Sequence, residues 1–237
     1  MFVVQECNTL FPGNLIGNYT RGKALTKYFE NVHKAEKKIF KDQPVSGKNI
    51  ILYPIQSGDL NQLGLKKLDS FLKSDLFIVF GSSFIKGPLV DFLIKRKAVN
   101  IHMGISPYYR GTDCNFWALY DKNPVLVGAT IHLLSKGLDS GKIISHAISE
   151  QYGNPFIYSM STVKSAFFCL KKMIKSKTLK KNKPIQQNKI LEIRYSRINE
   201  FNDIVIKKFF KMKNFLIHKK KYTLINPYKL KKKSFFI

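Results

Sequence analysis

The sequence predicts an α/β fold, an open Rossmann-like sheet with helices on both faces. The first reason is that apolar runs typical of strands alternate with amphipathic segments typical of helices between Phe2 and Ile174. The second is that 44% of the 237 residues are hydrophobic, so a packed core is feasible despite a formal net charge of +26. The third is the length itself, which fits one domain with or without a small appendage.

In the first third of the chain, segments whose apolar residues have the spacing of a strand alternate with segments whose apolar residues have the spacing of a helix. Leu25, Phe29 and Val32 recur at helical spacing, with lysines on the opposite side, and so predict an amphipathic helix. The elements expected here are a strand at Phe2–Val4, a helix at Arg21–Phe40, a strand at Asn49–Ile55 and a helix at Leu60–Leu72.

The middle third continues the alternation. Leu76–Phe80 is a continuous apolar run ending at Gly81, which predicts a strand buried on both faces. Pro88 suits the first turn of a helix, and Asp113 suits an N-cap. These patterns predict helices at Gly87–Lys95, Asp113–Tyr120 and Phe156–Ile174, and strands at Ala98–Ile101, Val125–Leu133 and Lys142–Ile148.

The amino-acid composition changes after Ile174. A Lys/Asn/Gln-rich segment containing Pro184 follows, and short apolar runs then alternate with lysine clusters. We therefore expect a compact domain at residues 1–178, and a Lys-rich linker with a small basic C-terminal appendage at 179–237. The appendage is either a small packed unit or a partly disordered tail.

The net charge is concentrated at the C-terminal end. Residues 1–160 hold 19 basic and 12 acidic side chains, whereas residues 161–237 hold 22 basic and 3 acidic ones. Only five of the basic residues are Arg, and the chain is also rich in Ile, Asn, Phe and Tyr, which share A/T-rich codons. Codon bias and a basic face for phosphate or nucleic acid both account for the lysines.

Several classes of protein are excluded by simpler features. No apolar run is long enough to cross a bilayer, and the N-terminal residues do not have the pattern of a secretory signal. Cys7, Cys114 and Cys169 are far apart and lack the spacing of a disulfide framework or a metal site. We therefore expect a soluble cytoplasmic protein without a metal.

Polar side chains gather where strands are expected to end. Asn100 and His102 are two residues apart, so both side chains leave the same face of their strand. Asp139 lies between Gly137 and Gly141 in a turn joining two expected strands. Alone, a histidine at a strand end or an aspartate in a turn is more often structural. Together they predict a site beyond the carboxyl ends of the strands.

Four motifs in this region form a specific ordered string. They are Asn100-Ile101-His102, Ser106 through Gly111 (SPYYRG), Gly128 through His132 (GATIH) and Leu138 through Gly141 (LDSG). This string closely resembles the 10-formyltetrahydrofolate-dependent formyltransferases, strongly over residues 75–150, weakly over 1–74, and not after about 180. That superfamily includes the glycinamide ribonucleotide, methionyl-tRNA and nucleotide-sugar N-formyltransferases.

The resemblance implies that Asn100, His102 and Asp139 are the catalytic residues. Formyl transfer to an amine passes through a tetrahedral intermediate, whose oxyanion Asn100 and a protonated His102 would stabilise as donors. Asp139 would raise the pKa of the imidazole and accept the proton of the attacking amine. This chemistry requires neither a metal nor a covalent enzyme nucleophile.

The resemblance also places the ligands. It implies that the pterin of 10-formyltetrahydrofolate is bound by Ser83, Phe84 and Ile85 and by the turn containing Ser135, Gly137 and Leu138. Packing in the core is the alternative role for Phe84 and Ile85. Tyr109 and Arg110 would contact the acceptor substrate, or instead brace their loop. The string Asn115-Phe116-Trp117 resembles the sugar branch, although core packing is the alternative for Trp117.

One departure from the family pattern concerns the N-terminus. Met1–Glu6 resembles the second strand of the family, so the fold is expected to lack the first βα unit and its phosphate-binding loop. The leading hypothesis is formylation of a primary amine on a nucleotide-linked amino sugar. The alternatives are a methionyl-tRNA formyltransferase-like enzyme, with residues 190–237 contacting RNA, and a truncated folate-binding member without activity.

Overall fold

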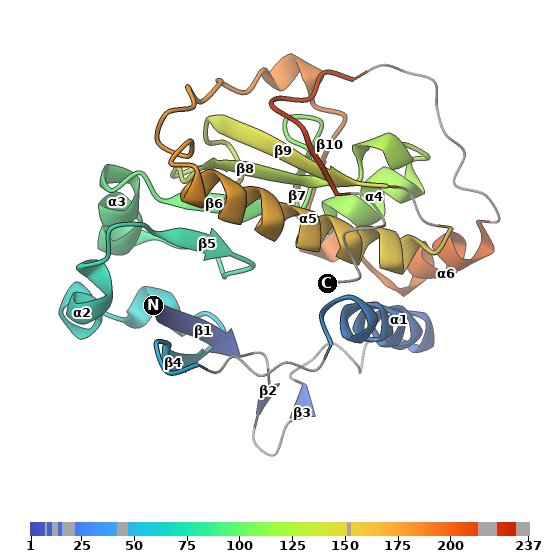
Figure 1. Ribbon diagram of the computed structural model, residues 1–237. Helices are drawn as coiled ribbons and strands as arrows, with labels where there is room; N and C mark the ends of the chain where they lie inside the picture. Colours follow the sequence, from blue (N-terminus) through green and yellow to red (C-terminus); the bar gives the residue numbers. More distant parts are fainter. Residues whose placement is uncertain are drawn as a thin grey trace.

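A computed structural model describes residues 1–7, 9–10, 14–15, 22–41, 47–150, 153–212 and 222–230. Its main sheet has five strands in the order β11-β9-β8-β6-β5 (Figure 1). These are β5 (Ile78–Phe80), β6 (Val99–His102), β8 (Ala129–Leu133), β9 (Ile143–Ser149) and β11 (Tyr228–Leu230). β6 runs parallel to β5 and antiparallel to β8, which is antiparallel to β9, while β11 runs parallel to β9. The sheet is therefore mixed.

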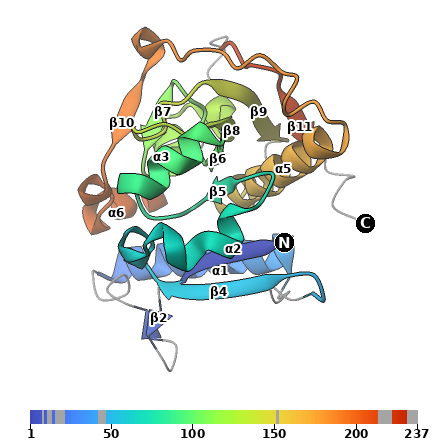
Figure 2. The same ribbon diagram turned by 90° about the vertical axis from the view of Figure 1, so that its left-hand side faces the viewer.

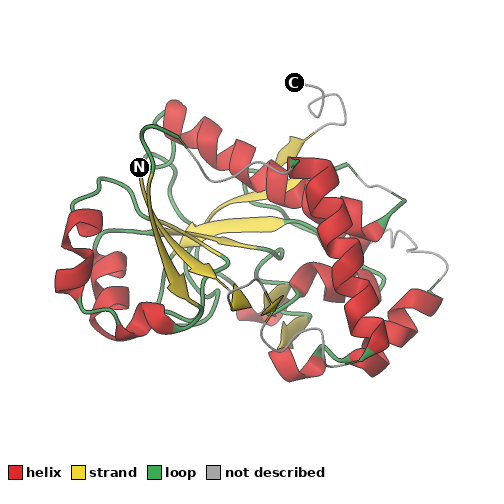
Figure 3. Ribbon diagram, turned by 90° about the horizontal axis from the view of Figure 1, so that it is seen from below, coloured by secondary structure: helices red, strands yellow, loops and turns green. Residues whose placement is uncertain are grey.

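Helices lie on both sides of the strands, as Figure 3 shows. Helix α5 (Pro155–Lys175) crosses one face, where its Ala166 and Leu170 pack against Val99 and Ile131. Helix α3 (Gly87–Lys95) packs on the other side, with Leu93 against Ala98. Because alternate residues of a strand face opposite ways, Val99 and Ile101 face α5, and Asn100 and His102 face away from it. The predicted α/β class is confirmed.

The N-terminal strands form two small sheets of their own. β1 (Phe2–Cys7) pairs in parallel with β4 (Ile51–Gln56), and β2 (Thr9–Leu10) pairs antiparallel with β3 (Asn14–Leu15). The prediction that Leu76–Phe80 is buried on both faces is wrong. β5 is an edge strand of the main sheet, so its Ile78 and Phe80 side chains are 46% and 42% exposed.

The expected helices are confirmed except at Leu60–Leu72. Helix α1 (Lys23–Phe40) and helix α4 (Cys114–Tyr120) match their predicted ranges closely, although Arg21 lies outside the described residues. The segment 59–72 instead forms two 3₁₀ turns, Asp59–Gln62 and Leu65–Leu68, and the short helix α2 (Asp69–Leu72). Gly64 between the turns has an extended backbone with ψ of 151°, so no continuous helix passes through it. The expected strand at Val125–Leu133 likewise begins only at Ala129, after a 3₁₀ turn at Pro124–Leu126.

Described residues beyond 178 pack into the same body, as Figure 2 shows for β10 and β11. β10 (Arg194–Ser196) pairs with β7 (Tyr109–Gly111), and helix α6 (Asp203–Lys211) buries Ile206 and Phe209 in the cluster containing Trp117. The Asp203 carboxylate also accepts hydrogen bonds from the backbone N–H groups of Ala24 and Leu25 in the first turn of α1. The predicted boundary after residue 178 therefore does not coincide with a break in packing. Residues 213–221 and 231–237 of the expected appendage lie outside the described residues.

A fully buried histidine predicts acid sensitivity of this fold. His146 Nδ1 accepts a hydrogen bond from Ile225 N–H, and its Nε2–H donates to the carbonyl of Ser106. Burial lowers the pKa of His146 from 6.5 to about 4, although the bond to Ser106 opposes the shift. Since the unfolded state binds the proton more readily, the stabilisation is complete above pH 6.5 and is lost as pH falls towards 4. We expect a loss of about 3 kcal/mol over that window.

Urea unfolding between pH 7.5 and 4.5 measures this loss. The variant His146→Gln retains a donor and an acceptor but does not titrate. Its free energy of unfolding should therefore fall less steeply with decreasing pH than that of the wild type, and the difference in slope should correspond to the uptake of about one proton. Equal slopes for the two proteins would contradict the assignment.

Candidate active site

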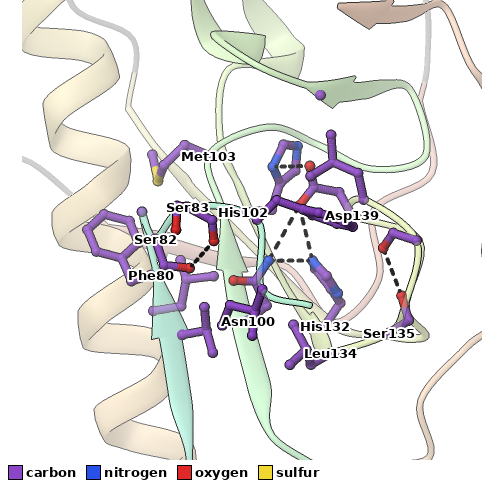
Figure 4. A pocket seen from close by; sticks show the side chains of 18 of the residues that line it. Phe80, Ser82, Ser83, Asn100, His102, Met103, His132, Leu134, Ser135 and Asp139 are labelled. Atoms are coloured by element: carbon purple, nitrogen blue, oxygen red, sulfur yellow. Dashed lines mark hydrogen bonds and ion pairs between the residues drawn. The ribbon is translucent and has the colours of Figure 1, made fainter. Parts of the chain in front are cut away.

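The predicted site residues meet on the face of β6 that points away from α5 (Figure 4). Asn100 and His102 alternate with Val99 and Ile101, so strand geometry alone brings the two polar side chains to one face. Asp139 reaches them from the turn between β8 and β9, 39 residues after Asn100. The structure therefore brings together all three residues predicted to be catalytic.

The Asp139 turn is held in an uncommon backbone conformation. Asp139 itself has φ of 47°, in the left-handed region. Gly141 leaves room for the carbonyl of Leu133, which would lie 1.7 Å from a Cβ atom at that position. Gln187 Nε2 donates to the carbonyls of Asp139 and Gly141, at 2.7 Å each, and Arg110 Nη2 donates to the carbonyl of Leu138. Nothing in the sequence of the expected linker pointed to Gln187.

Distances within the site form a connected network. His102 Nδ1 lies 3.2 Å from Asp139 Oδ2, and Asn100 Nδ2 donates to Asp139 Oδ1 at 3.4 Å. The other ring nitrogen of His102 lies 3.2 Å from the carbonyl oxygen of Tyr109. In Figure 4 the amide oxygen of Asn100 points away from Asp139. Donation from Asn100 to an oxyanion therefore requires an exchange of partners, most easily of the long bond to Asp139.

His132 is a member of the site that sequence reasoning missed. It lies opposite Asn100 in the β6–β8 register and is 1% exposed. Because its Nδ1 lies 2.8 Å from the carbonyl of Leu133, the proton belongs on Nδ1, and Nε2 accepts from Asn100 Nδ2 at 3.1 Å. Its place in the quoted GATIH motif, on the same strand face as Thr130, was the available signal.

Burial and neighbouring charges shift the pKa values of His102 and Asp139 in opposite directions. Burial lowers the pKa of His102, and the nearby Asp139 carboxylate and the Tyr109 carbonyl oppose this without reversing it. Burial would raise the pKa of Asp139, but His102, His132 and the backbone of Gly111 together hold it below its usual value. Asp139 is therefore ionised at neutral pH. Both ring nitrogens of His102 face acceptor oxygens, so a proton that arrives on the ring gains a second hydrogen bond.

A cavity of about 310 Å³ adjoins the network. All six positions predicted for the pterin line it, and so do the three predicted catalytic residues and His132. Its apolar walls include Val79, Phe80 and Leu134. The backbone N–H and hydroxyl of Ser83 both donate to the Glu6 carboxylate, which fixes the loop after β5 to the end of β1.

Tyr109 and Arg110 lie outside the lining of this cavity. Tyr109 is fully buried, and its hydroxyl group bonds Asp121 and Asn123. Arg110 is 8% exposed and pairs with Glu192. Contact of either side chain with substrate stays a prediction, which this placement does not favour. Among the described residues, no group of three or more His, Cys, Asp or Glu side chains could hold a metal ion, and no described helix is long and apolar enough to span a membrane.

The chain is similar to several known proteins. Residues 56–150 match the family model described as formyl transferase. Similar solved structures include the formyltransferase PseJ from Anoxybacillus kamchatkensis, in complex with UDP-4,6-dideoxy-4-formamido-L-AltNAc and tetrahydrofolate. It is 22% identical, over 78% of this chain and 85% of that chain, with a TM-score of 0.49. A 4-N formyltransferase from Francisella tularensis is 22% identical, over 73% of this chain and 74% of that chain, with a TM-score of 0.49.

The matched segment contains the candidate site. It includes Asn100, His102, His132 and Asp139, together with every residue that lines the cavity beside them. This segment, residues 56–150, is similar to the formyl transferase family.

Proposed function

We propose that the protein transfers a formyl group from 10-formyltetrahydrofolate to a primary amine on a nucleotide-linked amino sugar. The observation that carries this proposal is the Asn100–His102–Asp139 network at the wall of the 310 Å³ cavity. It combines an ionised carboxylate, an imidazole and an amide donor, which are the groups that amine attack on a formyl carbon requires.

The cavity residues fit the formyl donor. A flat heteroaromatic ring needs apolar walls with backbone polar groups at its edges, and Val79, Phe80 and Leu134 supply such walls. Gly137 keeps its turn compact, because a Cβ atom there would lie 2.5 Å from the Ser140 hydroxyl oxygen. 10-Formyltetrahydrofolate would supply the activated formyl group, and the residues of this cavity would position that group beside the catalytic network.

Each site residue has a separate task in this mechanism. As the amine nitrogen bonds to the formyl carbon, Asp139 accepts a proton from the amine, directly or through a water molecule. Asn100 donates a hydrogen bond to the oxygen that becomes negative, and His102 does so by exchanging its contact with the Tyr109 carbonyl for this oxygen. Asp139 passes the amine's proton to His102 Nδ1, 3.2 Å away, and His102 delivers a proton to the folate nitrogen as the bond from that nitrogen to the formyl carbon breaks. His132 holds the Asn100 amide in position throughout.

The proposal that the acceptor is an amino sugar is based on a sequence motif, so it needs a direct test with acceptor substrates. The Asn115-Phe116-Trp117 string supports the sugar branch. Incubation with 10-formyltetrahydrofolate and a panel of UDP- and dTDP-linked amino sugars should yield a formamide, detected by mass spectrometry and proton NMR. The variant His102→Ala serves as the inactive control.

Two other outcomes would overturn the proposal. Formylation of charged initiator tRNA, with no reaction on any sugar, would replace the acceptor class. Binding of 5-formyltetrahydrofolate without turnover of any acceptor would show a folate-binding protein.

A further inference from the structure

A second cavity, of about 280 Å³, is also lined by His102. The two cavities share His102, Met103 and Gly111 in their walls. The second is built from α1, α4, α5 and α6, which contribute the rings of Tyr28, Phe29, Phe116, Phe156 and Phe209. Reactants bound in the two cavities would therefore meet at His102.

One charged side chain stands out in this aromatic wall. Asp113 is the only Asp, Glu, Lys or Arg among the described residues that line the second cavity. Its side chain is exposed, and within the described part of the chain it forms no ion pair. A carboxylate among aromatic faces is a typical binding arrangement for an organic cation, because both attract positive charge.

The backbone conformation at Asp113 does not support its predicted role as the N-cap of α4. Asp113 occupies the N-cap position of α4, but its φ of 53° and ψ of 32° are left-handed, and its side chain accepts no capping hydrogen bond. The expectation that it caps the helix is therefore wrong. A strained conformation without the usual capping compensation leaves the carboxylate available to a ligand.

The local electrostatics agree with this geometry. Neighbouring groups partly shield the Asp113 carboxylate from water and raise its pKa to about 6, and the Thr112 hydroxyl opposes the shift. The carboxylate therefore stays in contact with solvent and is mostly ionised at neutral pH. A cationic ligand would supply the missing stabilisation.

We propose that Asp113 binds the protonated amine of the acceptor in the second cavity and holds it beside His102. The inference rests on the proposed function and extends it. It assigns Asp113 as the residue that selects an ammonium group over a hydroxyl group on an otherwise uncharged sugar ring. Asp113 acts in binding. The ammonium group loses one proton to solvent water before it attacks, and Asp139 accepts the second proton during the attack.

Calorimetry on the full chain tests the selection directly. The probes are UDP- and dTDP-linked amino sugars, each compared with the counterpart that has hydroxyl in place of the amine. We expect the wild type to bind the amine form about ten-fold or more tightly than the hydroxyl form, and Asp113→Asn to bind the two within about two-fold. Asparagine tolerates a left-handed backbone, so this variant should fold.

Two controls separate this assignment from the proposed function. Asp69→Asn, the same change at an exposed position on α2, should keep the wild-type preference. Binding of 5-formyltetrahydrofolate to the first cavity should be unchanged in both variants. Discrimination that persists in Asp113→Asn, or that is absent from the wild type, overturns the role of Asp113 even if formamide forms. Wild-type discrimination that Asp113→Asn loses, without formamide formation, upholds the assignment and overturns only the proposed function.

Discussion

Replacing Asp139 by Asn should lower kcat for formyl transfer by about 10²–10⁴-fold, the usual contribution of a general base. Asp139 is the ionised group of the site, and it contacts His102 Nδ1 at 3.2 Å and Asn100 Nδ2 at 3.4 Å. The variant keeps the shape of the side chain but cannot accept the amine's proton. Steady-state kinetics with a reactive acceptor gives kcat, and calorimetry with 5-formyltetrahydrofolate shows whether the first cavity is intact.

The pH profile provides an independent readout of the same residue. Because the pKa of Asp139 lies below its usual value, the carboxylate stays ionised, and the wild-type rate should not depend on its titration between pH 5 and 8. Asp69→Asn should have the wild-type rate, since that carboxylate is exposed and pairs only with Lys73 among the described residues. A kcat for Asp139→Asn within a few-fold of wild type would rule out the carboxylate as the base.

Replacing Asn100 by Ala should lower kcat by about 10²–10³-fold, as expected for loss of one oxyanion donor. The Kd for 5-formyltetrahydrofolate and the KM for the acceptor should change little, because the lost hydrogen bond forms only as charge develops. Rapid-quench measurement of the first turnover separates this chemical step from product release.

A structural role for Asn100 would give a different pattern. The amide also links His132 Nε2 and Asp139 Oδ1 on the unliganded surface. If that link were its only task, Asn100→Ala would lower the free energy of unfolding and leave kcat nearly intact. Asn31→Ala, at a partly exposed position of α1 where the side chain donates to the Lys27 carbonyl, is the matched control for loss of an asparagine side chain.

The sequence predicted those features that depend on neighbouring residues along the chain. The common face of Asn100 and His102 follows from strand alternation, and the α1 range follows from apolar spacing. Local patterns gave wrong predictions where contacts with distant parts of the chain determine the structure. Gly64 interrupts an amphipathic segment, and β5 is apolar yet lies at the edge of its sheet.

The candidate site shows the same division. Its three predicted catalytic residues and six cavity positions came from the resemblance to the formyltransferases, which rests on an ordered string of motifs at and after β6 and before β9. The partners of those residues came from distant segments: Gln187 holds the Asp139 turn across 48 residues, and Ile185 pairs with Ile143. Polar and lysine-rich composition suggested a linker there, because periodicity carries no information about which distant carbonyls a side chain will reach.

Sequence patterns were enough to predict the α/β class, the alternation that presents Asn100 and His102 together, and the glycine-flanked turn that carries Asp139. Contacts between distant segments bring His132 into the network, place Asp113 at a cavity instead of in a cap of α4, and join the described residues beyond 178 to the core. The two groups of features differ in the range of the interactions behind them. Strand pleat and helical period act over a few residues, whereas burial, cavity walls and hydrogen bonds between distant segments exist only once the chain has closed on itself.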